Sequence, residues 1–178
     1  GSGCSISKIG TNRVRPNIRL TIGPSGPSLS YPSSSYCTSG SDPSPTLTGN
    51  AGSGTYSSSA GLSINTSTGV IDLSASTAGA YTVTYTDTDT QTATFDVTIS
   101  SDTYYVSTTG SDSNNGLTSG TAFATLQKAI DMVGSNCAST TINVAAGTYN
   151  ENGVLISNKS NINIVGTGIS STIFSGGH

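Results

Sequence analysis

The stretch YYVSTTGSDSNNGLTSGTAFATLQKAI, residues 104–130, decides the fold of the C-terminal half of this chain. It begins with a short strand-like run, passes through a loop of Asp, Asn and Gly, and then changes to helical spacing. That spacing predicts a helix over residues 122–133, which Gly134 is expected to end. The apolar positions on its one face are Phe123, Leu126, Ala129, Ile130 and Val133. Elsewhere the pattern indicates strands and turns, so this single helix needs a specific role.

A repeat that follows the predicted helix suggests that role. TINV at 141–144 and NINI at 161–164 stand 20 residues apart, with Asn143 and Asn163 in matching places, and VLI and TIF recur at a similar spacing. Brief β segments joined by Gly and Asn corners at this period are typical of the coils of a parallel β-helix. The first coil of such a stack has an open end with unpaired backbone, and we expect the helix to cover it.

The order of strand, Asp/Asn/Gly loop, helix and INVAAGTYNE across residues 104–152 resembles the N-terminal start of right-handed parallel β-helix proteins of the pectate-lyase-like class. The resemblance implies that residues 102–178 form an N-terminal cap and the first coils of such a helix. Members of that class have many more coils, so we expect this part to be the front of a longer β-helix.

Residues 28–101 show a different pattern, that of short antiparallel strands. Leu62 and Ile64 alternate with polar neighbours and NTSTG predicts a turn, after which Ile71 and Leu73 resume the alternation, as in a β-hairpin. Two longer alternating runs follow, separated by DTDT. Their apolar positions are Tyr81, Val83 and Tyr85 in the first run and Ala93, Phe95, Val97 and Ile99 in the second. Closely spaced strands with one apolar face each predict a small β-sandwich.

The run GTYSSSAGLSINTSTGVIDLSASTAGAYTVTYT, within residues 30–100, resembles the Ig-like repeats of large secreted surface proteins of gliding and polysaccharide-degrading bacteria. IRLTI at 18–22 has a strand-like ending similar to that of FDVTI at 95–99, so we interpret residues 1–27 as the end of a preceding Ig-like module and a linker. The predicted fold class is all-β: an Ig-like β-sandwich followed by the helix-capped start of a right-handed parallel β-helix.

The three cysteines, Cys4, Cys37 and Cys137, lack the CxxC spacing of zinc knuckles or thioredoxin-like redox sites. In the Ig-like repeats an early cysteine such as Cys37 often has a partner just before the last strand, and TDTDTQTATFDVTIS contains none. The resemblance therefore leaves Cys37 either free or paired with Cys4.

The charge balance limits the partners. A net charge of −3 and a pI near 4.7 disfavour nucleic acid and anionic membranes, which require a basic surface. No run approaches the length of a transmembrane helix, so no membrane insertion is expected. The resemblances imply an extracellular or cell-surface location, with neighbouring modules of the same polypeptide and surface polysaccharide or other glycans as partners.

One loop has the composition of a cation site. In DSNNG, residues 112–116, Asp112 and Asn114 can supply oxygens to calcium, and the sequence predicts no other cofactor. The same residues also suit an Asx-turn loop that joins the strand to the helix.

Catalysis finds little support in the sequence. The only histidine is His178, which argues against Ser-His-Asp and Cys-His arrangements. Lys128, Lys159 and Glu151 are the charged residues considered for lyase or hydrolase chemistry, and we expect them to be solvated or structural. Six tyrosines are candidates for sugar stacking: Tyr31, Tyr36, Tyr56, Tyr104, Tyr105 and Tyr149.

These observations favour a structural and adhesive segment of a secreted or cell-surface bacterial protein, in which the Ig-like unit is a spacer that presents the β-helix. The alternative is the non-catalytic N-terminal part of a β-helix polysaccharide lyase or glycoside hydrolase. One fold serves many functions, so the resemblance alone does not separate the two.

Overall fold

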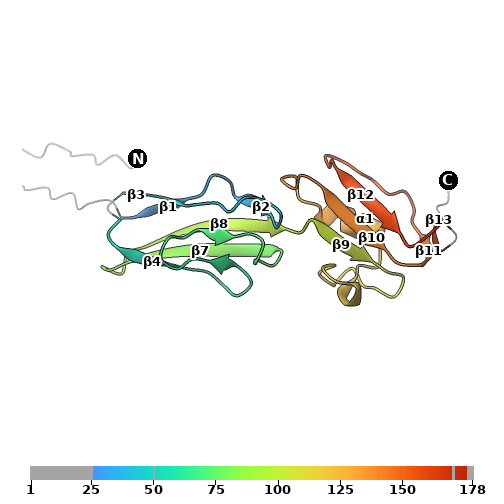
Figure 1. Ribbon diagram of the computed structural model, residues 1–178, viewed down its shortest axis with the longest axis horizontal. Helices are drawn as coiled ribbons and strands as arrows, with labels where there is room; N and C mark the ends of the chain where they lie inside the picture. Colours follow the sequence, from blue (N-terminus) through green and yellow to red (C-terminus); the bar gives the residue numbers. More distant parts are fainter. Residues whose placement is uncertain (1–25, 50, 170, 176–178) are drawn as a thin grey trace, which may run out of the picture.

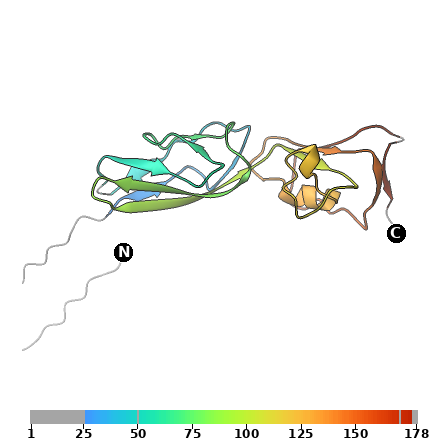
Figure 2. The same ribbon diagram turned by 90° about the horizontal axis from the view of Figure 1, so that it is seen from below.

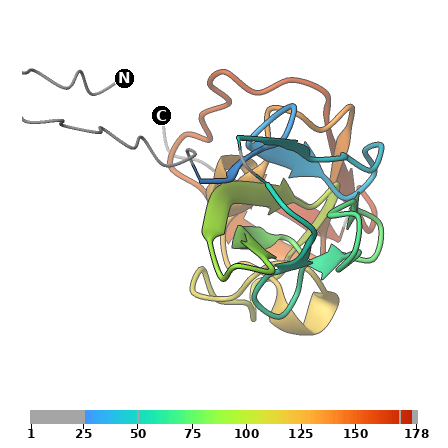
Figure 3. The same ribbon diagram turned by 90° about the vertical axis from the view of Figure 1, so that its left-hand side faces the viewer.

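The computed structural model describes residues 26–49, 51–169 and 171–175. The protein is mostly β-strand, arranged in several sheets, and therefore has an all-β fold. Its elements form two groups that lie end to end, residues 28–100 in one and 103–175 in the other (Figures 1 and 2). Viewed along the long axis, the first group lies in front of the second (Figure 3).

The first group contains eight strands among the described residues. They are β1 (Ser28–Ser30), β2 (Ser35–Cys37), β3 (Thr46–Thr48), β4 (Gly54–Ser57), β5 (Ser63–Ile64), β6 (Ile71–Asp72), β7 (Gly79–Asp87) and β8 (Thr92–Ser100). The main sheet has the order β2-β8-β7-β4, in which β2 is parallel to β8 and the other pairs are antiparallel. The pairs β1-β3 and β5-β6 form two smaller antiparallel sheets.

The first hydrophobic core contains four buried tyrosines, and three of them donate their hydroxyl groups to backbone carbonyl oxygens. The hydroxyl of Tyr31 donates to the carbonyl oxygen of Gly69 at 2.6 Å, and that of Tyr81 donates to Thr77 at 2.7 Å. Burial raises the pKa of Tyr31, with smaller contributions from other tyrosines. These bonds allow large aromatic side chains to fill the core without leaving a buried polar group unpaired.

Alternation predicted the four strands β5 to β8 of this group correctly. The hairpin forms as β5 and β6, with Ile64 paired to Ile71. Every second residue of β7 is buried from Tyr81 to Tyr85, and β8 shows the same alternation. The turn between them is held by the buried carboxylate of Asp87, which accepts hydrogen bonds from the backbone of Asp89 and Gln91. The expected strand within residues 1–22 and Cys4 lie outside the described residues.

The second group is built from parallel strands and helical turns. Its elements are β9 (Thr103–Val106), the 3-10 turn η1 (Ser119–Thr121), α1 (Leu126–Met132), β10 (Thr140–Val144), β11 (Gly147–Asn150), β12 (Ile162–Gly166) and β13 (Thr172–Ser175). One sheet has the order β12-β10-β9 and a second pairs β11 with β13, and every pair is parallel. The core lies between these sheets and α1, and includes Tyr104, Phe123, Ile130, Ile142 and Tyr149.

The strand register of this group differs from the expected repeat of 20 residues. Thr141 pairs with Asn163 and Asn143 pairs with Val165, so the offset between β10 and β12 is two residues longer than the predicted 20. In the corner before β12, Asn158 and Asn161 have left-handed backbone conformations. A shift of two keeps each side chain on its face, which is why the apolar pattern did not reveal it.

The structure also differs from the predicted recurrence of VLI and TIF. β13 contains the TIF segment, but its parallel partner is β11, residues 147–150, and not VLI at 154–156. Residues 154–156 have no regular secondary structure.

The helix is shorter than predicted. Residues 122–125 are outside α1, and Phe123 instead forms a parallel bridge with Val106, although its side chain is buried as expected. The helix begins after Thr125, whose hydroxyl accepts a hydrogen bond from the backbone of Lys128, an N-cap arrangement. α1 packs against β9 and β10.

Gly134 is required for a reason other than the predicted helix stop. Val133 is the C-cap residue, and Gly134 does not have a left-handed conformation. A Cβ atom at Gly134 would lie within 2.6 Å of the Ser100 side chain, so the glycine permits close approach between the loop after α1 and the end of β8.

The disulfide corrects the cysteine prediction. Cys37 is bonded to Cys137, with their Cα atoms 5.1 Å apart, so Cys37 is neither free nor paired with Cys4. Cys37 ends β2 in the first group, and Cys137 lies in the loop between α1 and β10 in the second. The two groups are therefore joined covalently at a second place besides the backbone between Ser100 and Thr103.

Candidate functional site

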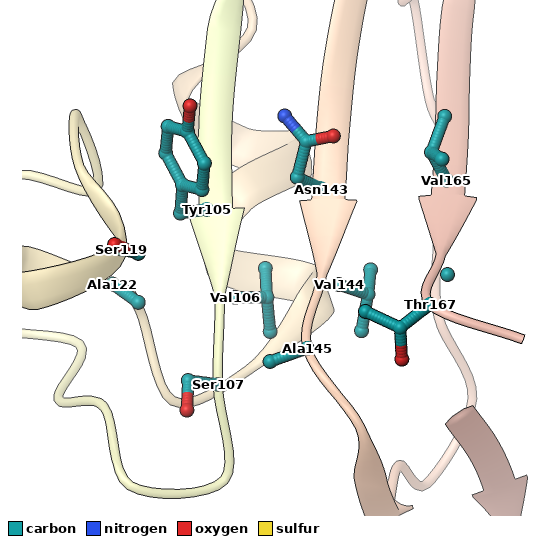
Figure 4. Close-up of a pocket in the computed structure, with 11 residues that line it drawn as sticks. Tyr105, Val106, Ser107, Ser119, Ala122, Asn143, Val144, Ala145, Val165 and Thr167 are labelled. Carbon is teal, nitrogen blue, oxygen red and sulfur yellow. The ribbon is translucent and has the colours of Figure 1, made fainter. Parts of the chain in front are cut away.

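A groove lies on the outer face of the sheet β12-β10-β9 (Figure 4). Its volume is about 640 Å³. The residues that line it are Tyr105, Val106, Ser107, Ser119, Ala122, Asn143, Val144, Ala145, Val165, Gly166 and Thr167. Three neighbouring strands and one loop therefore contribute to a single concave surface.

The strand periodicity determines which side chains face this groove. Tyr104 and Ile142 are buried in the core, so the next residues along β9 and β10, Tyr105 and Asn143, lie on the opposite face of the sheet. Asn143 is paired with Tyr105 on one side and with Val165 on the other. The result is a row of an aromatic ring, an amide and an apolar side chain across the three strands, as Figure 4 shows.

The loop that walls the groove is attached firmly to β9. The backbone N–H of Tyr105 donates to Gly116 and that of Phe123 donates to Tyr105, both at 2.9 Å. Gly116 has a φ of 69°, and a Cβ atom there would overlap the ring of Phe123. These constraints fix Ser119 and Ala122 beside the strand, so the groove has a formed wall before any ligand binds.

The lining favours a neutral ligand that combines hydroxyl groups with apolar faces. Ser107, Ser119 and Thr167 supply hydroxyl groups, and Asn143 supplies an amide that can both donate and accept. Tyr105 offers an aromatic ring, whereas none of the described lining residues is charged. Such a surface can form hydrogen bonds and stacking contacts but offers no ion pair to an anionic ligand.

The structure separates the six candidate tyrosines. Tyr31, Tyr56, Tyr104 and Tyr149 are buried in the two cores and cannot stack on a ligand. Tyr36 is half-buried, and its hydroxyl accepts a hydrogen bond from the backbone of Ser33. Tyr105 alone of the six lines the groove.

Sequence reasoning missed the companions of Tyr105. Asn143 was noted only as a repeat position, and Ser119 and Thr167 not at all. The alternation that buries Tyr104 and Ile142 could have placed Tyr105 and Asn143 together on the outer face. The contribution of Ser119 depends on the path of the loop, which strand periodicity does not specify.

Asp112, the first predicted calcium ligand, serves the loop that precedes α1. One carboxylate oxygen accepts hydrogen bonds from the backbone of Ala124 at 2.9 Å and Thr125 at 3.0 Å, and the other accepts from the Thr125 hydroxyl at 2.9 Å. The Asn114 amide donates to the carbonyl of Ala122 at 2.9 Å. A calcium ion bound by these two residues would share the Asp112 oxygens with those donors, and calcium binding stays a prediction.

The charged residues considered for catalysis lie around α1. Glu151 accepts a hydrogen bond from the backbone N–H of Leu126 at 2.7 Å, at the start of the helix. Lys159 donates to the carbonyl groups of Asp131 and Val133 at its end, where a cation is favourable. Lys128 is half-buried on the helix itself. None of the three lines the groove.

No protein-family model matches the chain, and a comparison with curated proteins finds no match. Within the described residues, no cluster of three or more His, Cys, Asp or Glu side chains could hold a metal ion. The helices in that part of the chain are too short or too polar to cross a bilayer.

Proposed function

We propose that this chain is a structural and adhesive segment of a secreted or cell-surface bacterial protein. In this proposal residues 28–101 form an Ig-like spacer, and residues 102–178 form the helix-capped start of a right-handed parallel β-helix. The two separate cores, at residues 29–99 and 104–149, support this division. The groove beside Tyr105 is the surface that contacts a glycan.

The observation that carries the proposal is the stacking of parallel strands in the second group. β10 pairs with β12 and β11 pairs with β13, so one strand–corner–strand unit lies directly on the next. Parallel strands require long crossover connections, and a coil that returns above itself supplies them. The buried side chains Leu126, Ala129 and Ile130 of α1 cover one side of this core, as a cap would.

The groove chemistry supports recognition of a neutral glycan rather than a nucleic acid. A sugar ring presents hydroxyl groups at its edge and C–H groups on its face, which match the Asn143 amide and the Tyr105 ring. The absence of charge from the described lining disfavours phosphate and uronate groups. We therefore expect neutral oligosaccharides to bind more tightly than polyuronates.

Binding of neutral oligosaccharides to the intact chain tests this proposal. A panel of neutral, uronate-containing and sulfated oligosaccharides would be screened on the immobilised protein, and hits would be measured by calorimetry. Tyr105→Ala should weaken binding at least tenfold because stacking and enclosure are both lost, whereas Tyr105→Phe should retain most of it.

A matched pair of asparagine variants controls for effects on folding. Asn143→Ala removes an amide from the groove, while Asn163→Ala removes one from β12 that does not line it. The first variant should weaken binding and the second should not. Equal effects of the two, or no binding by any neutral glycan, would reject the groove as the glycan site.

The disulfide supports the proposed location outside the cytoplasm. Cys37–Cys137 would persist in an oxidising compartment and be reduced in most cytosols. The alternative, the front of a polysaccharide lyase or hydrolase, predicts that groove variants change turnover by the complete enzyme rather than attachment of cells.

A further inference from the structure

The Cys37–Cys137 disulfide lies at the boundary between the two groups of elements. Cys37 pairs in register with Ser100, the last residue of β8, and β9 begins only three residues later at Thr103. The bridge therefore connects the end of β2 to the second group at the place where the backbone of β8 also enters it. Two covalent connections cross one boundary.

Other contacts hold the loop that carries Cys137 against the first group. The side-chain amide of Asn136 donates to the carbonyl oxygen of Ser35 at 2.7 Å. The backbone N–H of Thr38 donates to Ser100 at 3.0 Å, which ties the residue after Cys37 to the end of β8. Gly134 lies close to the Ser100 side chain. The bridge thus belongs to a packed junction, with polar contacts on both sides of it.

We propose that this disulfide carries mechanical load directly between its two cysteines, so that the segment between them is not stretched. When the chain is pulled from its two ends, tension passes from Cys37 through the sulfur–sulfur bond to Cys137. Residues 38–136 then form a closed loop that carries no end-to-end load. That loop contains β3 to β9 and α1, which are most of the first core together with the helix of the second.

The direction of the strands determines this path of the load. β2 and β8 are parallel and both end at the junction, so without the bridge the load on β8 would pass through the backbone at residues 100–103. Strands β4, β7 and β8 would then be pulled apart in sequence. With the bridge, only the segments outside the loop can extend. The inference does not depend on glycan binding, but tension of this kind is what a segment between a cell and its attachment site would experience.

Single-molecule stretching of the full chain, held by terminal tags that avoid cysteine chemistry, tests the proposal. The contour length of the fully unfolded chain should be shorter by roughly 330–360 Å when oxidised than after reduction, because the bridge spans 100 residues at about 3.3–3.6 Å each. The folded oxidised chain should also release no more than the described segments outside the loop, residues 26–36 and 138–175, which extend to roughly 160–180 Å.

Cysteine variants identify the bond responsible. Cys37→Ser and Cys137→Ser should each give the longer contour length without reductant, whereas Cys4→Ser should retain the shorter one. Contour length is measured on the unfolded chain, so the result stands even if a variant folds poorly. Equal lengths in the two redox states, a length set by Cys4, or oxidised unfolding that releases residues 38–136 would each overturn the proposal.

Discussion

The two cores of this protein differ in how they are closed. The first is surrounded by mostly antiparallel strands, and none of its described large apolar side chains is exposed. The second is covered by α1 near its first strand, but at its other limit Ile164 on β12 is 39% exposed and Phe174 on β13 is 42% exposed. In the preceding layer the paired residues Ile142 and Tyr149 are 0% and 3% exposed.

This difference reflects how stacked parallel strands extend a hydrophobic core from one strand to the next. Each layer buries the residues of the layer before it and presents an equivalent apolar row to the next. The first core is instead completed by the strands of its own group, and none of its described large apolar side chains is exposed. The second core therefore depends on its helix and on each neighbouring layer, whereas the first core depends on neither.

The largest effect is expected from charges placed in the face of α1. The double variant Leu126→Asp with Ile130→Asp buries two unpaired carboxylates against β9 and β10, which costs several kcal/mol. We expect the second core to unfold while the first remains folded. Amide hydrogen exchange resolved by peptide would show loss of protection in the second group, residues 103–175, and not in the first.

Two outcomes would contradict the expected difference between the two cores. If both cores lost protection together, the cores would be a single cooperative unit. If neither lost protection and the double variant remained monomeric, α1 would have no part in closing the second core.

The second-largest loss of stability is expected from substitutions at paired positions on the neighbouring strands β10 and β12. Ile142→Ala should cost about 2–5 kcal/mol, because it removes a fully buried side chain and leaves a cavity. Ile164→Ala occupies the paired position on β12 and should cost less than half as much, because its side chain is already partly in water. Urea denaturation of the two variants measures the difference. Equal losses would mean that β12 is covered to the same extent as β10.

Much of this contrast was predictable from alternation, which gives the face of each strand. It placed Tyr81, Val83 and Tyr85 in one core, while helical spacing placed the apolar residues of the helix segment in the other. Register is a different property, because a shift of two residues preserves the face, and the true pairing of Asn143 with Val165 was therefore not visible.

The groove and the disulfide depend on contacts between distant segments. Tyr105 was one of six equivalent tyrosines until the sheet placed it beside Asn143. Cys37 and Cys137 are 100 residues apart in different groups, and no local spacing connects them. Such features follow from the arrangement of whole elements, which the sequence of each element does not specify.

The third effect is the response to alkaline pH, which should be greater in the first core. Burial is the largest cause of the raised pKa values of Tyr31, Tyr56 and Tyr81 in the first core and of Tyr104 and Tyr149 in the second. A raised pKa in the folded state means that the unfolded chain releases its protons first. The tyrosine contribution to stability should therefore be constant below about pH 10, the ordinary tyrosine pKa, and be lost above it.

Thermal unfolding between pH 8 and pH 11.5 measures this dependence. Tyr31→Phe should make the decline shallower, because it removes a hydroxyl group that only the unfolded chain ionises readily. The slope of the melting temperature against pH is the readout, since the variant also loses the hydrogen bond to Gly69. A melting temperature that stays level above pH 10 would show that the tyrosine hydroxyls do not control alkaline stability.

The smallest effect is expected at Asp112, where the second core is joined to the loop that walls the groove. Asp112→Ala removes the acceptor for the N–H groups of Ala124 and Thr125 and should cost about 1 kcal/mol, since these bonds are exposed. If calcium also binds Asp112 and Asn114, millimolar calcium should raise the melting temperature of the wild-type chain by a few degrees, as expected for a ligand that binds only the folded state. Asp112→Asn should abolish that increase, because it removes the carboxylate. A calcium-dependent increase of the same size in Asp112→Asn would place the ion elsewhere and leave Asp112 solely as the residue that holds the start of α1.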